Sequence, residues 1–240
     1  MMTVKLGQYQ FAVYERKAKR LRQPSEEHQA EMISSLEVLC DLMHGSNFPW
    51  YLVGGLGIDA HLGLFTRHHH DIDIEVRSED VKEITEHMHS KGYLLLKRLL
   101  TANISTRKRL ALYQTEDGSS CLPSADVRVR FVKSQDGKVV DGELTFLSYI
   151  DVSFTKDHSN GVEIGYKGKT FTLPVQYTSK EMSYRLNGHR LMLRNPMYQA
   201  VLKLSYMHPI DVFDSKNLMQ KFNDGEREII GETVKRLLSN

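Results

Sequence analysis

Apolar residues recur at helical spacing near the start of the chain. Between residues 25 and 44 they fall three or four positions apart, at Met32, Ile33, Leu36, Leu39, Cys40 and Met43. That period predicts an amphipathic helix, and Ser25 is a residue type that caps helix N-termini well. A further helix is predicted over residues 78–91 with Ser78 as its cap, because acidic residues follow Ser78 and Gly92 comes directly after the helix end.

Strict alternation replaces this period at residues 71–76. Ile72, Ile74 and Val76 alternate with acidic residues, among them Asp71 and Asp73. Neighbouring residues of a strand point to opposite faces, so the apolar side chains face the core and the two aspartates project together. The pattern predicts a strand that carries a pair of carboxylates.

A glycine pair precedes this strand. A short apolar strand over residues 50–53 leads to Gly54 and Gly55, which open a short helix that ends at Gly63. Backbone without side chains at a helix N-terminus allows a phosphate to approach the N–H groups and the positive end of the helix dipole. We therefore expect Gly54 and Gly55 to contact the phosphates of a nucleotide.

The rest of the chain divides into a β-rich part and a helical part. Strands are predicted at residues 109–115, 125–132, 143–155, 161–166 and 169–173. From Thr178 the period becomes helical, with helix starts predicted at Asn195-Pro196 and Pro209, and Asp224 is predicted to cap the last helix. The predicted organisation is a mixed α/β catalytic domain over residues 1–175, which includes the N-terminal helix, and a C-terminal helical region over residues 176–240.

Composition adds few constraints. The chain has 240 residues, of which 40% are hydrophobic and 26% charged, as is usual for a globular protein. No stretch approaches eighteen apolar residues and the N-terminus lacks an apolar signal segment, so we expect a cytoplasmic protein without a membrane partner. Its two cysteines, Cys40 and Cys121, have no second thiol nearby in sequence, so neither a zinc motif nor a disulfide framework is indicated.

Charge is nearly balanced, with a net value of +2, but basic residues cluster near the N-terminus at Lys17, Lys19, Arg20 and Arg22. A solvated helix face and a nucleic-acid contact both fit this cluster. The composition therefore leaves the partner of this segment open.

The aspartate pair indicates a metal site. Two carboxylates this close repel each other unless a cation lies between them, and Mg²⁺ prefers such hard oxygen ligands. A third carboxylate is expected for a two-metal site, and Asp151 fits because apolar residues flank it. Asp126 is the alternative, although Arg128 and Arg130 on the same strand face would explain it as part of an ion-paired surface. Asp71, Asp73 and Asp151 are thus the predicted metal-binding and catalytic residues.

Nine positions at fixed spacing make the front of the chain recognisable: Gly54, Gly55, Asp59, Gly63, Thr66, Arg67, His69, Asp71 and Asp73. This pattern resembles the nucleotidyltransferases that adenylylate lincosamides and aminoglycosides, within the polymerase-β-like superfamily. The resemblance implies an α+β fold, in which a core of mixed sheet with flanking helices is followed by a C-terminal helical region. It also implies two Mg²⁺ ions, an NTP as co-substrate, and a phosphate or substrate contact for Arg67.

The rear half is similar, more loosely, to abortive-infection toxin nucleotidyltransferases. The similarity includes Asp151, Gly168, Lys203, Asp211 and Asp214, although Pro209 and Ile210 stand where that family carries Arg and Lys. It implies that Lys203 and Asp211 bind the nucleotide. Two simpler explanations remain open: an exposed helix lysine for Lys203, and helix N-terminal acids stabilised by the dipole for the aspartates.

The predicted reaction is transfer of a nucleoside monophosphate from an NTP to a hydroxyl, with release of pyrophosphate. A small antibiotic acceptor is favoured by the front motif, whereas tRNA or a non-catalytic NTP-binding module are the alternatives.

Successive histidines rarely converge on one metal, so the run His68-His69-His70 favours zinc weakly, and His69 could instead orient the carboxylates. Four tyrosines fit either a substrate cleft or the core: Tyr177, Tyr184, Tyr198 and Tyr206.

Overall fold

The computed structural model describes residues 2–6, 9–13, 21, 23–69, 71–97, 128–135, 138–139, 149–166, 169–178, 182–186, 188–206 and 208–239. Several predictions lie outside these residues: the strand at 109–115, the basic cluster of Lys17, Lys19, Arg20 and Arg22, and the residues His70, Cys121, Asp126 and Gly168.

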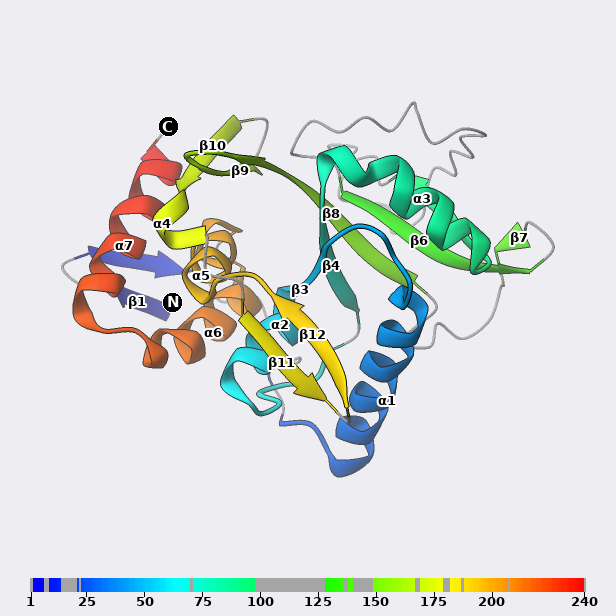
Figure 1. Ribbon diagram of the computed structural model, residues 1–240. Coiled ribbons are helices and arrows are strands. Elements are labelled where there is room, and N and C mark those ends of the chain that lie inside the picture. The colour runs from blue at the N-terminus through cyan, green and yellow to red at the C-terminus, as the bar shows by residue number, and fades with distance from the viewer. Residues whose placement is uncertain are drawn as a thin grey trace, which may run out of the picture.

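A mixed sheet forms the centre of the molecule (Figure 1). Its strands lie in the order β10 (Lys169–Pro174), β9 (Gly161–Tyr166), β8 (Tyr149–His158), β4 (Ile72–Arg77), β3 (Trp50–Val53), β12 (His189–Leu193) and β11 (Met182–Leu186). Strand β4 runs parallel to β8 and antiparallel to β3, while β3 runs parallel to β12. Strand β6 (Arg128–Gln135) also pairs with β8, and with β5 (Tyr93–Lys97) and β7 (Lys138–Val139). This mixture of parallel and antiparallel pairs confirms the predicted α+β class.

Helices flank the sheet and fill the C-terminal part of the chain (Figure 1). They are α1 (Glu26–Met43), α2 (Gly54–Leu62), α3 (Val81–Ser90), α4 (Val175–Thr178), α5 (Pro196–Tyr206), α6 (Pro209–Leu218) and α7 (Asp224–Ser239). The hairpin of β1 (Met2–Leu6) and β2 (Tyr9–Val13) forms a separate small sheet beside α7. None of the described helices is long and apolar enough to cross a membrane.

The predicted starts of α1 and α5 are confirmed by their caps. The Ser25 hydroxyl accepts a hydrogen bond from the His28 N–H at 3.2 Å. The Asn195 side-chain oxygen accepts one from the Met197 N–H at 2.8 Å, directly before the first-turn proline. These bonds satisfy backbone donors that have no partner inside the helix.

Two other predicted caps are wrong. Ser78 begins a short 3₁₀ turn (Ser78–Asp80), and its hydroxyl donates to the Thr155 carbonyl at 2.8 Å instead of capping α3. Helix α7 is capped by Asn223 and not by Asp224. The Asn223 side chain accepts from the Glu226 N–H at 3.0 Å and the Glu226 carboxylate accepts from the Asn223 N–H at 2.9 Å, which is a capping box.

The helical prediction directly after Thr178 is also wrong, because residues 182–193 form the hairpin of β11 and β12. Leu191 and Leu193 alternate with more exposed neighbours and are buried, and Leu193 pairs with Leu52 of β3. The sequence between the paired residues Leu186 and His189 is Asn-Gly, an established hairpin sequence, and Gly188 has a φ of 89°. The helices from Pro196 onward agree with the prediction, whereas the division at residue 175 stays a prediction.

Two apolar clusters hold these elements together. One lies between the sheet and helices α1 and α3, and it contains the fully buried Ile72, Ile74 and Val76 of β4. The other lies among α5, α6 and α7. Helix α2 contributes Leu56 to the first cluster and Ile58 to the second, so it joins both. Its N-terminus is therefore held firmly next to the polar face of β4.

Candidate active site

Two of the predicted carboxylates lie side by side in the sheet. Asp73 of β4 pairs in register with Asp151 of β8, while Ile72 pairs with Ile150 and Ile74 with Val152. Paired residues of neighbouring strands point to the same face, about 4.8 Å apart. Because the isoleucines are fully buried on one face, the two aspartates share the other. The predicted position of Asp151 beside the first carboxylate strand is thus confirmed, and its metal and catalytic roles stay predictions.

The start of α2 is built around Asp73. Gly54 directly follows Val53, which pairs in register with Asp73. The backbone of Gly54 has a positive φ of 68°. A Cβ atom at Gly54 would overlap the Asp73 carboxylate. Only glycine satisfies both conditions, since other residues are strained at this φ and would displace Asp73. A carboxylate here also lies where the positive end of the helix dipole favours it.

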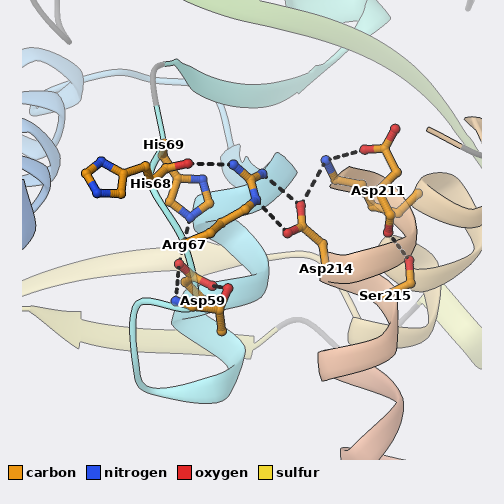
Figure 2. Close-up of polar contacts among 9 residues, drawn as sticks. Asp59, Arg67, His68, His69, Asp211, Asp214 and Ser215 are labelled. Carbon is orange, nitrogen blue, oxygen red and sulfur yellow. Dashed lines mark hydrogen bonds and ion pairs between the residues drawn. The ribbon is translucent and has the colours of Figure 1, made fainter. Parts of the chain in front are cut away.

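The second glycine serves the loop that follows α2. A Cβ atom at Gly55 would overlap Nη2 of Arg67 and the ring of His69. Asp59 organises the same loop: it accepts hydrogen bonds from the Thr66 N–H at 3.1 Å and the Thr66 hydroxyl at 2.7 Å, and it lies 2.7 Å from His69 Nε2 (Figure 2). His69 therefore pairs with Asp59. These contacts explain the two glycines, and the predicted phosphate contact of Gly54 and Gly55 stays a prediction.

A buried charge network joins this loop to the C-terminal helices, and we call it the latch (Figure 2). Its members are Arg67, Lys203, Asp211 and Asp214. Nε and Nη2 of Arg67 donate to the two carboxylate oxygens of Asp214 at 2.7 and 2.8 Å. Nζ of Lys203 donates to Asp211 at 2.8 Å and lies 3.5 Å from Asp214. One fully buried carboxylate, that of Asp214, is thus shared by two cations.

The latch keeps its charges at neutral pH. Burial opposes the charge of Lys203, but the nearby carboxylates of Asp211, Asp214 and Asp73 outweigh it and raise the Lys203 pKa above its ordinary value. Burial would likewise raise the pKa of Asp214, yet the bonds and charges of Arg67 and Lys203 hold this pKa below its ordinary value. Since the Lys203 side chain is only 15% exposed, the reading of it as an ordinary exposed lysine is wrong. Because Asp73 acts on its pKa, the ammonium group is close to the candidate site.

Asp211 lies in the first turn of α6, where the dipole stabilises an acid, and it also binds Lys203. The guanidinium of Arg67 is buried and bound to Asp214, with Nη1 donating to the His68 carbonyl at 2.9 Å. The contacts of Arg67, Lys203 and Asp211 thus connect elements of the protein to one another. Their predicted nucleotide contacts stay predictions.

Sequence reasoning missed a third acid on the site face. Glu75 follows Asp73 by two residues, so it points to the same face, and it is buried. Nε of Arg194 donates to one Glu75 oxygen and the Tyr198 hydroxyl donates to the other. Nη2 of Arg194 also donates to the Thr155 hydroxyl at 2.9 Å. Alternation placed Glu75 on this face, but nothing local in the sequence indicates its partners.

The contact with Glu75 shows where Tyr198 lies. Tyr198 is buried against Glu75, and burial together with the Glu75 charge raises the Tyr198 pKa well above its ordinary value. Burial opposes the charge of Arg194, but the Glu75 charge outweighs it and raises the Arg194 pKa. Tyr198 therefore belongs to the core and does not line a cleft.

The donor set at the site fits Mg²⁺. Asp73 and Asp151 offer paired hard oxygen ligands, and Asp71 directly precedes β4 and is close enough to raise the pKa of Arg67. Within the described part of the chain, no three His, Cys, Asp or Glu side chains converge into a ready metal cage. Mg²⁺ does not need such a cage, because it usually keeps several waters and binds one or two carboxylates plus substrate phosphates.

Comparisons with known proteins show what the chain is similar to. A family model described as aminoglycoside-2''-adenylyltransferase matches residues 35–118, which include the glycine pair and the aspartates Asp71 and Asp73. Among curated proteins, no significant match was found.

Three solved structures are similar at low identity. The solution structure of the antibiotic-resistance factor ANT(2'')-Ia matches at 13% identity, over 88% of this chain and 94% of that one, with a TM-score of 0.57. The crystal structure of ANT(2'')-Ia in complex with adenylyl-2''-tobramycin matches at 14% identity, over 85% and 97%, with a TM-score of 0.55. The lincomycin-bound lincosamide adenylyltransferase LnuA matches at 18% identity, over 77% and 94%, with a TM-score of 0.49.

The fold is therefore that of the polymerase-β-like nucleotidyltransferases. Within this fold, residues 35–118, which carry Asp71 and Asp73, are similar to the aminoglycoside-2''-adenylyltransferase family. The looser similarity of the rear half to abortive-infection toxins stays a prediction.

Proposed function

We propose that the protein is a Mg²⁺-dependent nucleotidyltransferase that transfers a nucleoside monophosphate from an NTP to a hydroxyl of a small molecule. The observation that carries this proposal is the pairing of Asp73 with Asp151 directly beside Gly54 at the start of α2. The match of residues 35–118 to the aminoglycoside-2''-adenylyltransferase model supports it. An aminoglycoside or lincosamide is the proposed acceptor class.

The proposed roles follow from position. Asp73 and Asp151, with Asp71, would hold two Mg²⁺ ions, which when bound neutralise the triphosphate. The acceptor oxygen attacks the α-phosphorus, the bond from that phosphorus to the β-phosphate bridging oxygen breaks, and pyrophosphate leaves. Asp151 would complete the metal site or accept the proton of the attacking hydroxyl. Most of the acceleration in such reactions comes from positioning and charge neutralisation.

Lys203 and Arg67 are the two cations of the latch, and the Asp73 carboxylate contributes to the raised pKa of Lys203. We propose that Lys203 contributes positive charge beside the triphosphate, while Asp211 and Asp214 hold it in place. Arg67 would act on the other side of the same network, next to Asp71. The Gly54–Gly55 backbone N–H groups would face the phosphates.

The test is turnover of the full chain with Mg²⁺, each labelled NTP, and a panel of aminoglycosides and lincosamides. Pyrophosphate release should require Asp73, and Asp73→Asn should lower it by at least about a thousandfold, because the buried site depends on that charge. Asp224→Asn, on an acid of α7 that is 97% exposed, is the control and should leave turnover unchanged. A folded Asp73→Asn protein with wild-type turnover contradicts the proposal.

Total tRNA is included in the same panel, because an RNA acceptor is the main alternative. If RNA is the acceptor, its binding should weaken steeply with salt, and replacing Lys17, Lys19, Arg20 and Arg22 with Gln should flatten that dependence. A small acceptor should be turned over equally by this variant. If tRNA is labelled and no antibiotic is modified, RNA is the acceptor and the small-molecule proposal is wrong. NTP binding without any product would indicate a non-catalytic module.

A further inference from the structure

Three acids alternate along Asp71 and the polar face of β4, and the charge of each acts on a cation from another part of the chain. Asp71 acts on Arg67 of the preceding loop, and Asp73 acts on Lys203 of α5. Glu75 binds Arg194, which directly follows β12. The first two acids belong to the proposed metal site, whereas Glu75 has no role in it. A buried carboxylate two residues from Asp73 therefore needs an explanation.

Both oxygens of Glu75 are occupied. One accepts from Arg194 and the other from Tyr198, so Glu75 presents no free oxygen to a metal ion beside Asp73. Arg194 is itself fixed from several sides. It donates to Thr155, lies 3.3 Å from Asp157, and its guanidinium lies 4.0 Å from the centre of the Tyr51 ring. Such a guanidinium stays charged at any pH at which the protein is folded.

We propose that Arg194 and Glu75 are positioning residues that set the charge of the metal site: Arg194 cancels the Glu75 charge and keeps that carboxylate from competing as a ligand. This inference rests on the proposed function, since it assumes that Asp73 holds a divalent cation. Side chains two residues apart on one strand face are neighbours, and the burial of Glu75 and Arg194 excludes much of the water that would screen their charges. The pair therefore controls how tightly Asp73 and Asp151 bind a divalent cation.

The experiment titrates the full chain with Mn²⁺, without nucleotide, and follows free Mn²⁺ by electron paramagnetic resonance. Glu75→Gln leaves the Arg194 charge uncompensated near Asp73, so Mn²⁺ affinity should fall by about tenfold. The double variant Glu75→Gln/Arg194→Gln removes both charges and should recover affinity to within about threefold of wild type. Recovery by deleting a second buried residue is not expected from a purely structural role.

Two further variants separate charge from geometry. Glu75→Asp keeps the charge but shortens the side chain, so it should lose stability in urea unfolding while retaining Mn²⁺ affinity. Asp157→Asn removes an acid beside the same guanidinium, but one that is 37% exposed, so it should leave Mn²⁺ affinity unchanged. If Glu75→Gln fails to fold, Glu75→Asp and the double variant decide the outcome, because both must still bind Mn²⁺ as the wild type does.

The proposal is overturned if the double variant binds Mn²⁺ no better than Glu75→Gln, or if Glu75→Asp loses as much affinity as Glu75→Gln. Asp73→Asn in the same titration distinguishes this failure from failure of the proposed function. Loss of Mn²⁺ binding in Asp73→Asn with no response to the Glu75 variants rejects the inference alone. Wild-type Mn²⁺ binding in Asp73→Asn rejects the metal site on which both depend.

Discussion

The two faces of strand β4 are built by opposite means. On one face, Ile72, Ile74 and Val76 are fully buried and contact a single apolar cluster between the sheet and helices α1 and α3. On the other, Asp73 and Glu75 meet side chains from β8, from α5 and from the residue that follows β12. Apolar packing does not depend on direction, whereas each charge needs a particular partner.

This difference has a practical consequence. Changes on the apolar face should lower stability by an amount that is insensitive to pH and metal. Changes on the polar face, or in the latch, should have effects that depend on pH, on the charge of the new side chain or on a divalent cation. The three predictions below test this division, beginning with the largest expected change in stability.

The largest effect is expected at Asp214. Asp214→Asn keeps the shape but leaves the buried Arg67 and Lys203 without their shared anion, so the free energy of unfolding should fall by about 3–5 kcal/mol. Urea unfolding followed by circular dichroism measures this loss. Asp224→Asn is the matched control, because Asp224 pairs with Arg227 while almost fully exposed, and it should cause no measurable change. Equal effects of the two variants would contradict the latch.

The pH dependence of this effect has a defined sign. The folded-state pKa of Asp214 lies below the ordinary aspartate value, so its contribution is complete above about pH 5. It is lost as pH falls through the folded-state pKa, because Asp214 then takes up a proton. The stability difference between wild type and Asp214→Asn should therefore shrink on acidification. A difference that stays constant between pH 7 and the acid limit of folding would contradict this assignment.

A smaller loss is expected on the apolar face. Ile74→Ala creates a cavity in the cluster under the sheet and should lower the free energy of unfolding by about 3 kcal/mol. The same loss should be measured at pH 7 and pH 5, since no charge is involved. Mn²⁺ affinity of the folded variant should match that of wild type. A loss of Mn²⁺ binding would show that the two faces are not independent.

The smallest change in stability is expected for a comparison of two glycines. Gly54 and Gly63 have similar positive φ values of 68° and 75°, so alanine at either should cost about 1–2 kcal/mol. Only Gly54 lies against Asp73, whereas nothing lies within 4 Å of a Cβ atom at Gly63. Gly54→Ala should therefore weaken Mn²⁺ binding and Gly63→Ala should not. If both variants bind Mn²⁺ alike, the contact between Gly54 and Asp73 does not shape the site.

Local pattern was sufficient to predict β4, the turn at Gly54 and the apolar strand around Asp151. These features depend on alternation and on residue types that tolerate only a few backbone conformations. The α+β class followed from the same signals together with the nine-position motif. The start of α5 was also predictable, because Asn195 caps this helix and Pro196 stands in its first turn.

Pairings between distant residues were not predictable in this way. Arg67 and Asp214 are separated by 147 positions, and Arg194 and Glu75 by 119, so no local period relates them. Lys203 looked like a possible surface residue because its two acidic partners lie on the next helix. The β11–β12 hairpin was missed for a different reason: its Asn187-Gly188 turn was overlooked within a stretch read as helical.

The pairing of β12 with β3 has a consequence for how the protein reaches its native state. Leu193 and Leu52 lie about 140 positions apart, and the chain between them contains β4 and β8. Contacts between such distant residues form slowly, because a long loop must close before they gain any energy. Helix α5, with Lys203, follows β12 directly. During synthesis, Asp73 and Asp151 would thus leave the ribosome well before Lys203, and the latch should form only after the last third of the chain has been made.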